Sequence, residues 1–243
     1  MATFVLVHGA WHGAWCWIKL TPELEALGHR VVTFDLPGHG SDATPRETVT
    51  LNSYASRIVK ALDAIDEKVI LLGHSMGGMA ITAAAEQRPE KLKALVYLAA
   101  FLPRNSESLF ALEERNPRPS VPPNLVPSKN GKTATVNQER ITDLFYHDCC
   151  TEDIAYATER LSPQPLELLT TPVNVSEKNF DSVSRIYIEC TDDRAISIEL
   201  QRDMTRCSPC TEVISLNTSH SPFFSAPGKL ARILHEHAGN AEF

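Results

Sequence analysis

The chain has 243 residues and a formal net charge of −7 at pH 7, with 43% hydrophobic and 22% charged residues. This length suits a single α/β domain with a sizeable core, and the acidic balance, with no block of Lys and Arg, argues against a nucleic-acid partner. No apolar run is long enough to span a bilayer, and the first residues enter a strand pattern at once, so we expect neither a membrane partner nor a signal peptide.

Apolar runs typical of strands alternate with helical patterns through the first hundred residues. In chain order, the patterns predict strands at 3–7, 30–35, 69–72 and 95–99, separated by helices at 19–27, 51–65 and 79–88. Alternation of this kind is typical of βαβ units, whose strands lie parallel in one sheet. The predicted class is therefore α/β, with a mainly parallel sheet flanked by helices.

The alternation stops after Phe101. Residues 102–183 are rich in proline and carry only short helical patterns, chiefly at 137–145 and 152–161. Sheet rhythm then resumes with strands at 186–190 and 212–216 and helices at 198–206 and 227–237. We interpret residues 102–183 as a mainly helical cap inserted into one domain that covers residues 1–243, placed over the strand ends where open α/β sheets bind ligands.

Six cysteines are scattered along the chain, too few for a disulfide framework at this length, and we expect mostly free thiols. Cys207 and Cys210 have the spacing of a redox or zinc motif. They lie late in the chain, away from the early strand-to-helix turn of a thioredoxin-like site, and no second pair accompanies them. We predict no metal and no cofactor.

The pentapeptide Gly-His-Ser-Met-Gly at residues 73–77 lies between an apolar strand pattern and a helix pattern. A strand that turns directly into a helix holds the turn residue in strained geometry, and flanking glycines permit the close approach of the chain. This context nominates Ser75 as a nucleophile. The helix N-terminus beneath it offers free amides, and the amide of Met76 is a candidate oxyanion donor.

A serine nucleophile needs a histidine base and an acid that orients it, in the chain order Ser, acid, His. Of the nine histidines, His220 lies just past the last predicted strand, on the loop edge where Ser75 should stand. It is the predicted general base and acid. The loop after strand 186–190 offers Asp192 and Asp193 as the acid, and the residues themselves do not choose between them.

The loop after the first strand completes the predicted site. The amide of Ala10 can point at the same oxyanion as the amide of Met76. His8 precedes Ser75 in the chain, so we interpret it as a structural histidine that packs under this loop. The Gly-His-Gly at residues 38–40 lacks the third glycine of a dinucleotide-binding motif.

Taken together, these segments resemble the α/β-hydrolase superfamily over essentially the full length, in the branch of plant methylesterases, hydroxynitrile lyases and pyrethroid-type bacterial carboxylesterases. The resemblance is carried by residues 4–15, 73–78, 186–193 and 219–222. In the superfamily pattern the acid leads into a short hydrophobic step, here Asp193-Arg194-Ala195-Ile196. The resemblance thus favours Asp193 over Asp192.

The same comparison separates esterase from lyase. Related hydroxynitrile lyases carry a Thr, an acidic residue and a Lys where this chain has Gly9, His74 and Ser221. Without a positive charge to hold departing cyanide, lyase activity is the lesser alternative. Some superfamily members keep the triad and serve as receptors, so a ligand-binding role with little turnover is the second alternative.

The sequence therefore predicts a serine carboxylesterase that hydrolyses a small to medium apolar, aryl or alkyl ester through an acyl-enzyme. Trp11, Phe145 and Tyr146 are candidate pocket walls, with further candidates at Phe110, Leu125, Leu144, Leu166, Trp15 and Trp17. Simple packing is the more common role for such side chains. We expect a small-molecule ester as the partner and a cytoplasmic location, and a homodimer is compatible with this interpretation.

Overall fold

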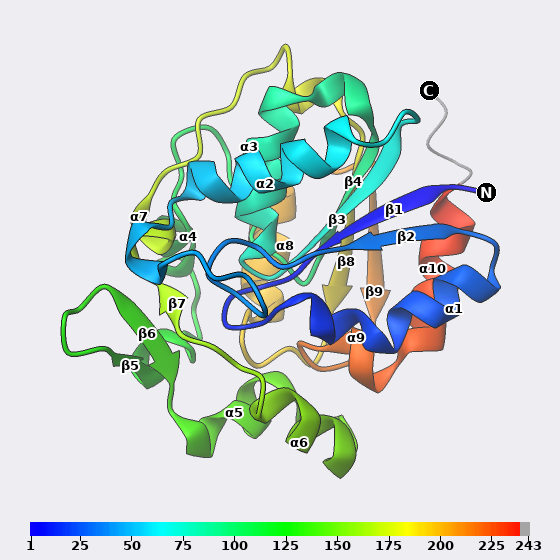
Figure 1. Cartoon of the computed structure of the whole chain (residues 1–243). Coiled ribbons are helices and arrows are strands. Elements are labelled where there is room, and N and C mark those ends of the chain that lie inside the picture. Colours follow the sequence, from blue (N-terminus) through cyan, green and yellow to red (C-terminus); the bar gives the residue numbers. More distant parts are fainter. Residues whose placement is uncertain (239–243) are drawn as a thin grey trace.

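The computed structural model describes residues 1–238 (Figure 1). Its centre is a six-stranded, fully parallel sheet in the order β2-β1-β3-β4-β8-β9. The strands are β1 (Thr3–Val7), β2 (Arg30–Thr33), β3 (Val69–His74), β4 (Leu92–Leu98), β8 (Arg185–Cys190) and β9 (Glu212–Leu216). This confirms the predicted parallel α/β class, and every strand lies within three residues of its predicted bounds.

Burial explains which strands the sequence identifies most clearly. All residues of the central strands β1 and β3 are buried, as expected of parallel strands that are covered on both faces. The edge strands β2 and β9 expose at least half of their residues. A continuous apolar run therefore marks the middle of the sheet.

Helices cover both faces of this sheet, with α2 packed on α3 on one side and α1 packed on α10 on the other (Figure 1). Their bounds are α1 (Leu20–Ala26), α2 (Leu51–Asp63), α3 (Gly77–Gln87), α8 (Ile198–Cys207), α9 (Pro222–Ser225) and α10 (Pro227–Ala238). In α2, Thr50 and Ser53 form a capping box that fixes the start of the helix. None of the helices in residues 1–238 is long and apolar enough to cross a membrane.

The segment between β4 and β8, which we call the cap, connects two neighbouring strands of the central sheet. It contains the helices α4 (Leu109–Glu113), α5 (Gln138–Phe145), α6 (Thr151–Thr158) and α7 (Glu167–Thr170). It also contains a small antiparallel sheet, not predicted from the sequence, of β5 (Leu125–Pro127), β6 (Thr133–Val136) and β7 (Gln164–Pro165). Strands of two to four residues are too short to produce a recognisable alternation of polar and apolar residues.

Because the central strands are parallel, their carboxyl ends share one edge of the sheet. The loops after β1, β3, β8 and β9 carry Ala10, Ser75, Asp193 and His220, respectively. The fold therefore brings residues that are far apart in the chain to one edge, as expected for ligand sites of open α/β sheets. The six cysteines are unpaired, and all lie within the described residues.

Candidate active site

Ser75 occupies the turn between the end of β3 and the start of α3. Its φ angle is +54°, a left-handed conformation that is uncommon for a residue other than glycine. Three backbone hydrogen bonds hold it there: the Ser75 amide donates to Leu98 O at 3.3 Å, and the amides of Phe101 and Gly78 donate to Ser75 O at 3.1 and 3.0 Å. Strain of this kind persists only where the surroundings impose it, and it is common at functional sites.

The glycines on either side of Ser75 allow this tight turn. A Cβ atom on Gly73 would lie 2.7 Å from the carbonyl oxygen of Gly77, and a Cβ atom on Gly77 would lie 2.7 Å from the carbonyl oxygen of His8. Neither position has room for a side chain. The turn that the pentapeptide predicts is thus present, with the N-terminus of α3 pressed against the loop that follows β1.

His220 is paired with Asp193. Its Nδ1 lies 2.7 Å from Asp193 Oδ2, and both side chains are almost fully buried. The other carboxylate oxygen of Asp193 accepts hydrogen bonds from the amides of Ala195 (2.7 Å) and Ile196 (2.9 Å). With Nδ1–H donated to the carboxylate, Nε2 is the nitrogen of His220 that can accept a proton.

Asp192 points elsewhere. Its carboxylate contacts His147 Nε2 at 3.0 Å, and its side chain is 60% exposed. The two adjacent carboxylates thus face different partners, and of the two only Asp193 contacts His220. The geometry agrees with the choice that the family resemblance favoured.

Gln201, on α8, fixes the loop that carries Asp193. Its side-chain amide donates to Asp193 Oδ2 at 3.3 Å and to the carbonyl of Ile196 at 2.8 Å, while its Oε1 accepts from the amide of Cys190 at 3.0 Å. This residue was not predicted from the sequence. A lone Gln on the face of a helix carries no pattern that would reveal such a role.

His74 supports His220 from the other side. Its Nε2 donates to the carbonyl oxygen of His220 at 2.8 Å, and the two ring centroids are 4.5 Å apart. Burial is the main cause that holds the pKa of His74 well below its usual range, so the ring is neutral. The sequence marked His74 only as a difference from the lyases, whereas the structure shows that it positions the His220 loop.

Ala10 and Met76, whose amides are the predicted oxyanion donors, both line the cavity together with Ser75. Within residues 1–238, neither amide is hydrogen-bonded to another group of the protein. Met76 immediately precedes α3, where the partial positive charge of a helix N-terminus is concentrated. Two unoccupied donors beside a serine hydroxyl are the arrangement that stabilises a developing oxyanion.

Trp11 ties the loop that carries Ala10 to the cap. Its amide donates to Gln164 Oε1 at 3.3 Å, its carbonyl accepts from the amide of Ser162 at 2.9 Å, and its indole Nε1–H donates to the carbonyl of Ala134 at 3.0 Å. Its φ of +63° is a second strained conformation at the site. The cap therefore holds this loop in place as well as covering it.

His12 makes a further link between the loop and the cap. Its Nδ1–H donates to the carbonyl of Ala10 at 2.7 Å, and its Nε2 accepts from the hydroxyl of Tyr146 at 2.7 Å. Burial lowers the pKa of His12 to about 3, consistent with a neutral ring.

A further hydrogen bond joins the cap to the loop that carries His220. Asp148 of the cap accepts from the amide of Ser219 at 2.8 Å, next to His220.

His8 is buried beneath the same loop. Its Nδ1–H donates to the carbonyl of Gly9 at 2.9 Å, and its Nε2 accepts from the amide of Leu36 at 3.1 Å. Both ring nitrogens are thus used by the backbone, and burial lowers the pKa to about 4. These contacts are those of the structural histidine that the sequence predicts.

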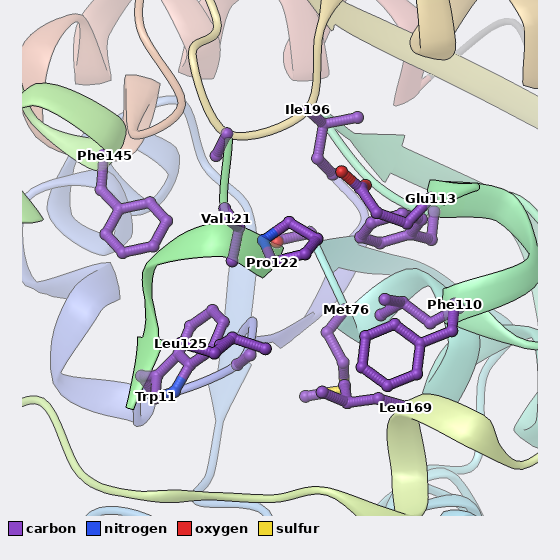
Figure 2. A pocket seen from close by; sticks show the side chains of 15 residues that line it. Trp11, Met76, Phe110, Glu113, Val121, Pro122, Leu125, Phe145, Leu169 and Ile196 are labelled. Carbon is purple, nitrogen blue, oxygen red and sulfur yellow. The ribbon is translucent and has the colours of Figure 1, made fainter. Parts of the chain in front are cut away.

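A cavity opens beside Ser75, and Figure 2 shows the 15 residues that line it. The wall is apolar except at Ser75 and Glu113. Of the predicted pocket walls, Trp11 and Phe145 line the cavity and Tyr146 does not, because its side chain is buried against His12. The cap contributes Leu109, Phe110, Glu113, Val121, Pro122, Leu125, Phe145 and Leu169.

Leu144, Leu166, Trp15 and Trp17, the remaining candidates for the pocket wall, are not among the lining residues. Leu144 and Trp17 are almost fully buried, and Leu166 and Trp15 pack against the core. Packing was the more common role expected for such side chains, and it is the role that these four have.

Comparisons with known proteins place this geometry in a family. The sequence matches the alpha/beta hydrolase family model over residues 4–233. Salicylic acid-binding protein 2 of Nicotiana tabacum is 37% identical, over 96% of this chain and 95% of its own length. Methylesterase 2 of Arabidopsis thaliana is 35% identical, over 94% of this chain and 92% of its own.

Among solved structures, a pyrethroid hydrolase from Sphingobium faniae JZ-2 superposes with a TM-score of 0.88 at 29% identity, over 100% of this chain and 99% of its own. These matches confirm the fold and the family branch that the sequence segments predict. The chain belongs to the alpha/beta hydrolase family, among its carboxylic ester hydrolases.

Proposed function

We propose that this chain is a serine carboxylesterase in which Ser75 is the nucleophile, His220 the general base and acid, and Asp193 the residue that orients His220. One observation carries the proposal: His220 Nδ1 lies 2.7 Å from a buried Asp193 carboxylate, on the strand edge where Ser75 sits in a strained turn. A carboxylate at Nδ1 fixes the tautomer in which Nε2 can take the serine proton.

In the first half of the reaction, Ser75 Oγ attacks the ester carbonyl and its proton passes to His220 Nε2. The carbonyl oxygen becomes an oxyanion, which the amides of Ala10 and Met76 stabilise. The imidazolium form of His220 is stabilised by Asp193. The C–O bond to the alcohol then breaks, His220 gives its proton to the departing alcohol, and the acyl group remains on Ser75.

In the second half, water takes the place of the alcohol. His220 removes a proton from the water as it attacks the acyl carbonyl, and the same two amides stabilise the second oxyanion. Collapse of this intermediate returns the proton to Ser75 Oγ and releases the carboxylic acid. No other group of the chain needs to change protonation state.

The lining of the cavity supports an apolar substrate. It is almost entirely hydrocarbon, as in most small-molecule sites. Aryl or alkyl esters fit this chemistry better than phosphorylated or highly charged ones, which would lose hydration without gaining a partner.

The receptor alternative is favoured by one finding, namely that the tobacco relative is named for binding salicylic acid. The lyase alternative loses support at Gly9, because a Cβ atom there would lie 2.9 Å from the Cβ of Ser75. A Thr in its place, as in related lyases, requires the two loops to move apart. Ser221 is fully buried and carries no charge that could hold cyanide.

Two measurements on purified protein test the proposal. The first is labelling of Ser75 by a fluorophosphonate, and the second is turnover of a panel of methyl, aryl and bulky alkyl esters. We expect labelling together with turnover, and Ser75→Ala should lose both, with a fall in kcat on the order of a millionfold. Labelling without turnover of any ester would instead favour the receptor, and wild-type turnover by Ser75→Ala would refute the assignment.

The cytoplasmic location and the homodimer remain predictions from the sequence. Fractionation of the source cells tests the first, and sedimentation of the purified chain tests the second.

A further inference from the structure

Glu113 is an unusual residue in the wall of the cavity. It lies at the end of cap helix α4, is 6% exposed, and is the only ionisable side chain among the residues that line the cavity. Figure 2 shows it beside Ile196 and Phe110, across the cavity from Phe145 and Trp11. Carboxylates are rarely buried without a partner.

The protein satisfies only one of the two carboxylate oxygens of Glu113. Asn116 Nδ2 donates to Glu113 Oε1 at 2.8 Å. Within the described residues, Oε2 accepts no hydrogen bond, and no Lys, Arg or His forms an ion pair with this carboxylate. Oε2 is not fully enclosed by protein atoms, and Glu113 lines the cavity.

The hydrogen bonds that residue 113 makes within the fold do not require a carboxylate at this position. Asn116 uses its other side-chain atom, Oδ1, to accept from the hydroxyl of Ser197 at 2.7 Å, and that hydroxyl in turn caps α8. This chain of bonds needs one acceptor from residue 113, which an amide would provide without the cost of burying a charge. Burial raises the pKa of Glu113 to about 7, and the nearby Asp193 carboxylate adds to this rise.

We propose that Glu113 is a specificity-determining residue that accepts a hydrogen bond from a donor group of the ester, a hydroxyl or an ammonium, through its open Oε2. The proposal rests on the esterase function proposed above. The substrate class becomes an apolar ester that carries one donor group away from its carbonyl, since every other part of the lining is hydrocarbon or belongs to the Ser75 site.

A hydroxyl is the donor that the cavity accommodates at the lower cost. An ammonium group would have to give up its hydration in an apolar enclosure with one carboxylate as its only counter-charge there, and such transfer is expensive. A hydroxyl needs only the one bond that Oε2 offers. We therefore expect the hydroxyl to be preferred.

The test compares esters that differ only in the donor. The p-nitrophenyl esters of 6-hydroxyhexanoate, 6-methoxyhexanoate, hexanoate and 6-aminohexanoate probe the acyl side. Acetate esters of 1,6-hexanediol and its monomethyl ether probe the alcohol side. The methoxy group accepts but cannot donate a hydrogen bond. Rates are measured above neutral pH, where Glu113 is ionised, and kcat/KM is compared within each pair.

For the wild type we expect kcat/KM to favour hydroxy over methoxy by roughly tenfold to a hundredfold in at least one series, which is the loss associated with one hydrogen bond to a charged acceptor. In Glu113→Gln, the Asn116 bond keeps the amide oxygen and turns the NH₂ group toward the cavity, so the preference should disappear or reverse. Glu113→Leu should favour hexanoate. Glu114→Gln, on the exposed neighbour, should behave as the wild type.

The inference would be overturned if both Glu113 variants kept the wild-type preference for hydroxy over methoxy esters. It would also be overturned if the wild type showed no such preference in either series. A stronger preference for the amino ester that Glu113→Gln abolishes would support the donor subsite and identify the donor as a cation. Failure of the esterase function looks different, because the wild type would then hydrolyse none of these esters. Glu113→Gln keeps the Asn116 bond, and its unfolding midpoint shows whether it is folded.

Discussion

The two sides of the cavity are built from different materials. On the sheet side, Asp193, His220 and His74 are joined by hydrogen bonds to one another and to backbone amides and carbonyls. On the cap side, the wall is hydrocarbon, and its single carboxylate, Glu113, has one open oxygen. The sheet edge therefore carries the residues of the proposed chemistry. The cap carries the residues that would contact the rest of the ester.

The two sides are nonetheless joined at the loop after β1. Trp11 bonds the cap through its amide, its carbonyl and its indole, and His12 bonds Tyr146. A change in the cap can therefore reach the amide of Ala10.

The largest effect is expected at the carboxylate that orients His220. Asp193→Asn should lower kcat on the order of ten-thousandfold, because an amide no longer enforces the productive tautomer of His220. The matched control is Asp192→Asn, whose side chain is 60% exposed and faces His147, and it should change kcat by less than about threefold. Steady-state kinetics on a small aryl ester gives kcat for both variants. An equal fall in kcat for the two variants would contradict the assignment of Asp193.

Acid should lower the free energy of unfolding, because His8 and His12 are buried as neutral rings in the loop after β1. The pKa values of His8 and His12 are lowered by burial to about 4 and about 3, below the ordinary value of 6.5. The unfolded chain therefore binds more protons than the folded chain below pH 6.5, and stability falls as pH drops from about 6.5 toward 4. The expected loss is about 1.4 kcal/mol per pH unit for each histidine, measured by urea unfolding.

The carboxyl of Glu113 should act in the opposite direction. Its pKa is raised by burial to about 7, so the folded state holds the extra proton between about pH 4.5 and 7, and this contribution to stability grows as pH falls. Glu113→Gln should therefore lose stability more steeply on acidification than the wild type does. A shallower slope in the variant would contradict the burial that we describe for this carboxyl.

Removing the hydroxyl of Tyr146 should weaken the link between the cap and the loop after β1. Tyr146→Phe leaves His12 Nε2 buried without a donor, at a cost of about 1–3 kcal/mol in the free energy of unfolding. Tyr156→Phe is the control, since its hydroxyl bonds no other residue of the described chain. Equal unfolding midpoints for the two variants would mean that the Tyr146 bond adds nothing.

The smallest effect is expected in the cap wall. Leu125→Ala removes hydrocarbon from the cavity, so KM for a bulky alkyl ester should rise by roughly three- to tenfold while kcat for a methyl ester stays near that of the wild type. The ratio of the two substrates is the quantity to measure. A fall in kcat for both esters would show that the cap wall also affects the chemical step.

The sheet was predictable from the sequence because its central strands are continuous apolar runs and its helices begin and end at clear signals. The position of Ser75 followed from a local motif, since the glycines at 73 and 77 are required by contacts within a few residues. The prediction of His220 followed from chain order together with its place just past the last strand. In each case a short-range or ordering rule was sufficient.

Other features depend on contacts between distant segments. The choice between Asp192 and Asp193 is decided by what each carboxylate faces across the fold, His147 or His220. The contacts of Gln201 and the exclusion of Tyr146 from the cavity come from packing of the same kind. No periodicity or spacing in the chain records such contacts.

Passage of the acyl group through Ser75 can be followed by rapid quenching. Wild-type protein is mixed with p-nitrophenyl acetate, quenched in acid within the first turnover, digested and analysed by mass spectrometry. We expect a burst of p-nitrophenol and an acetyl group on the peptide that contains Ser75, both absent from Ser75→Ala. Hydrolysis with no burst, or acetylation of another residue that persists in Ser75→Ala, would contradict the account.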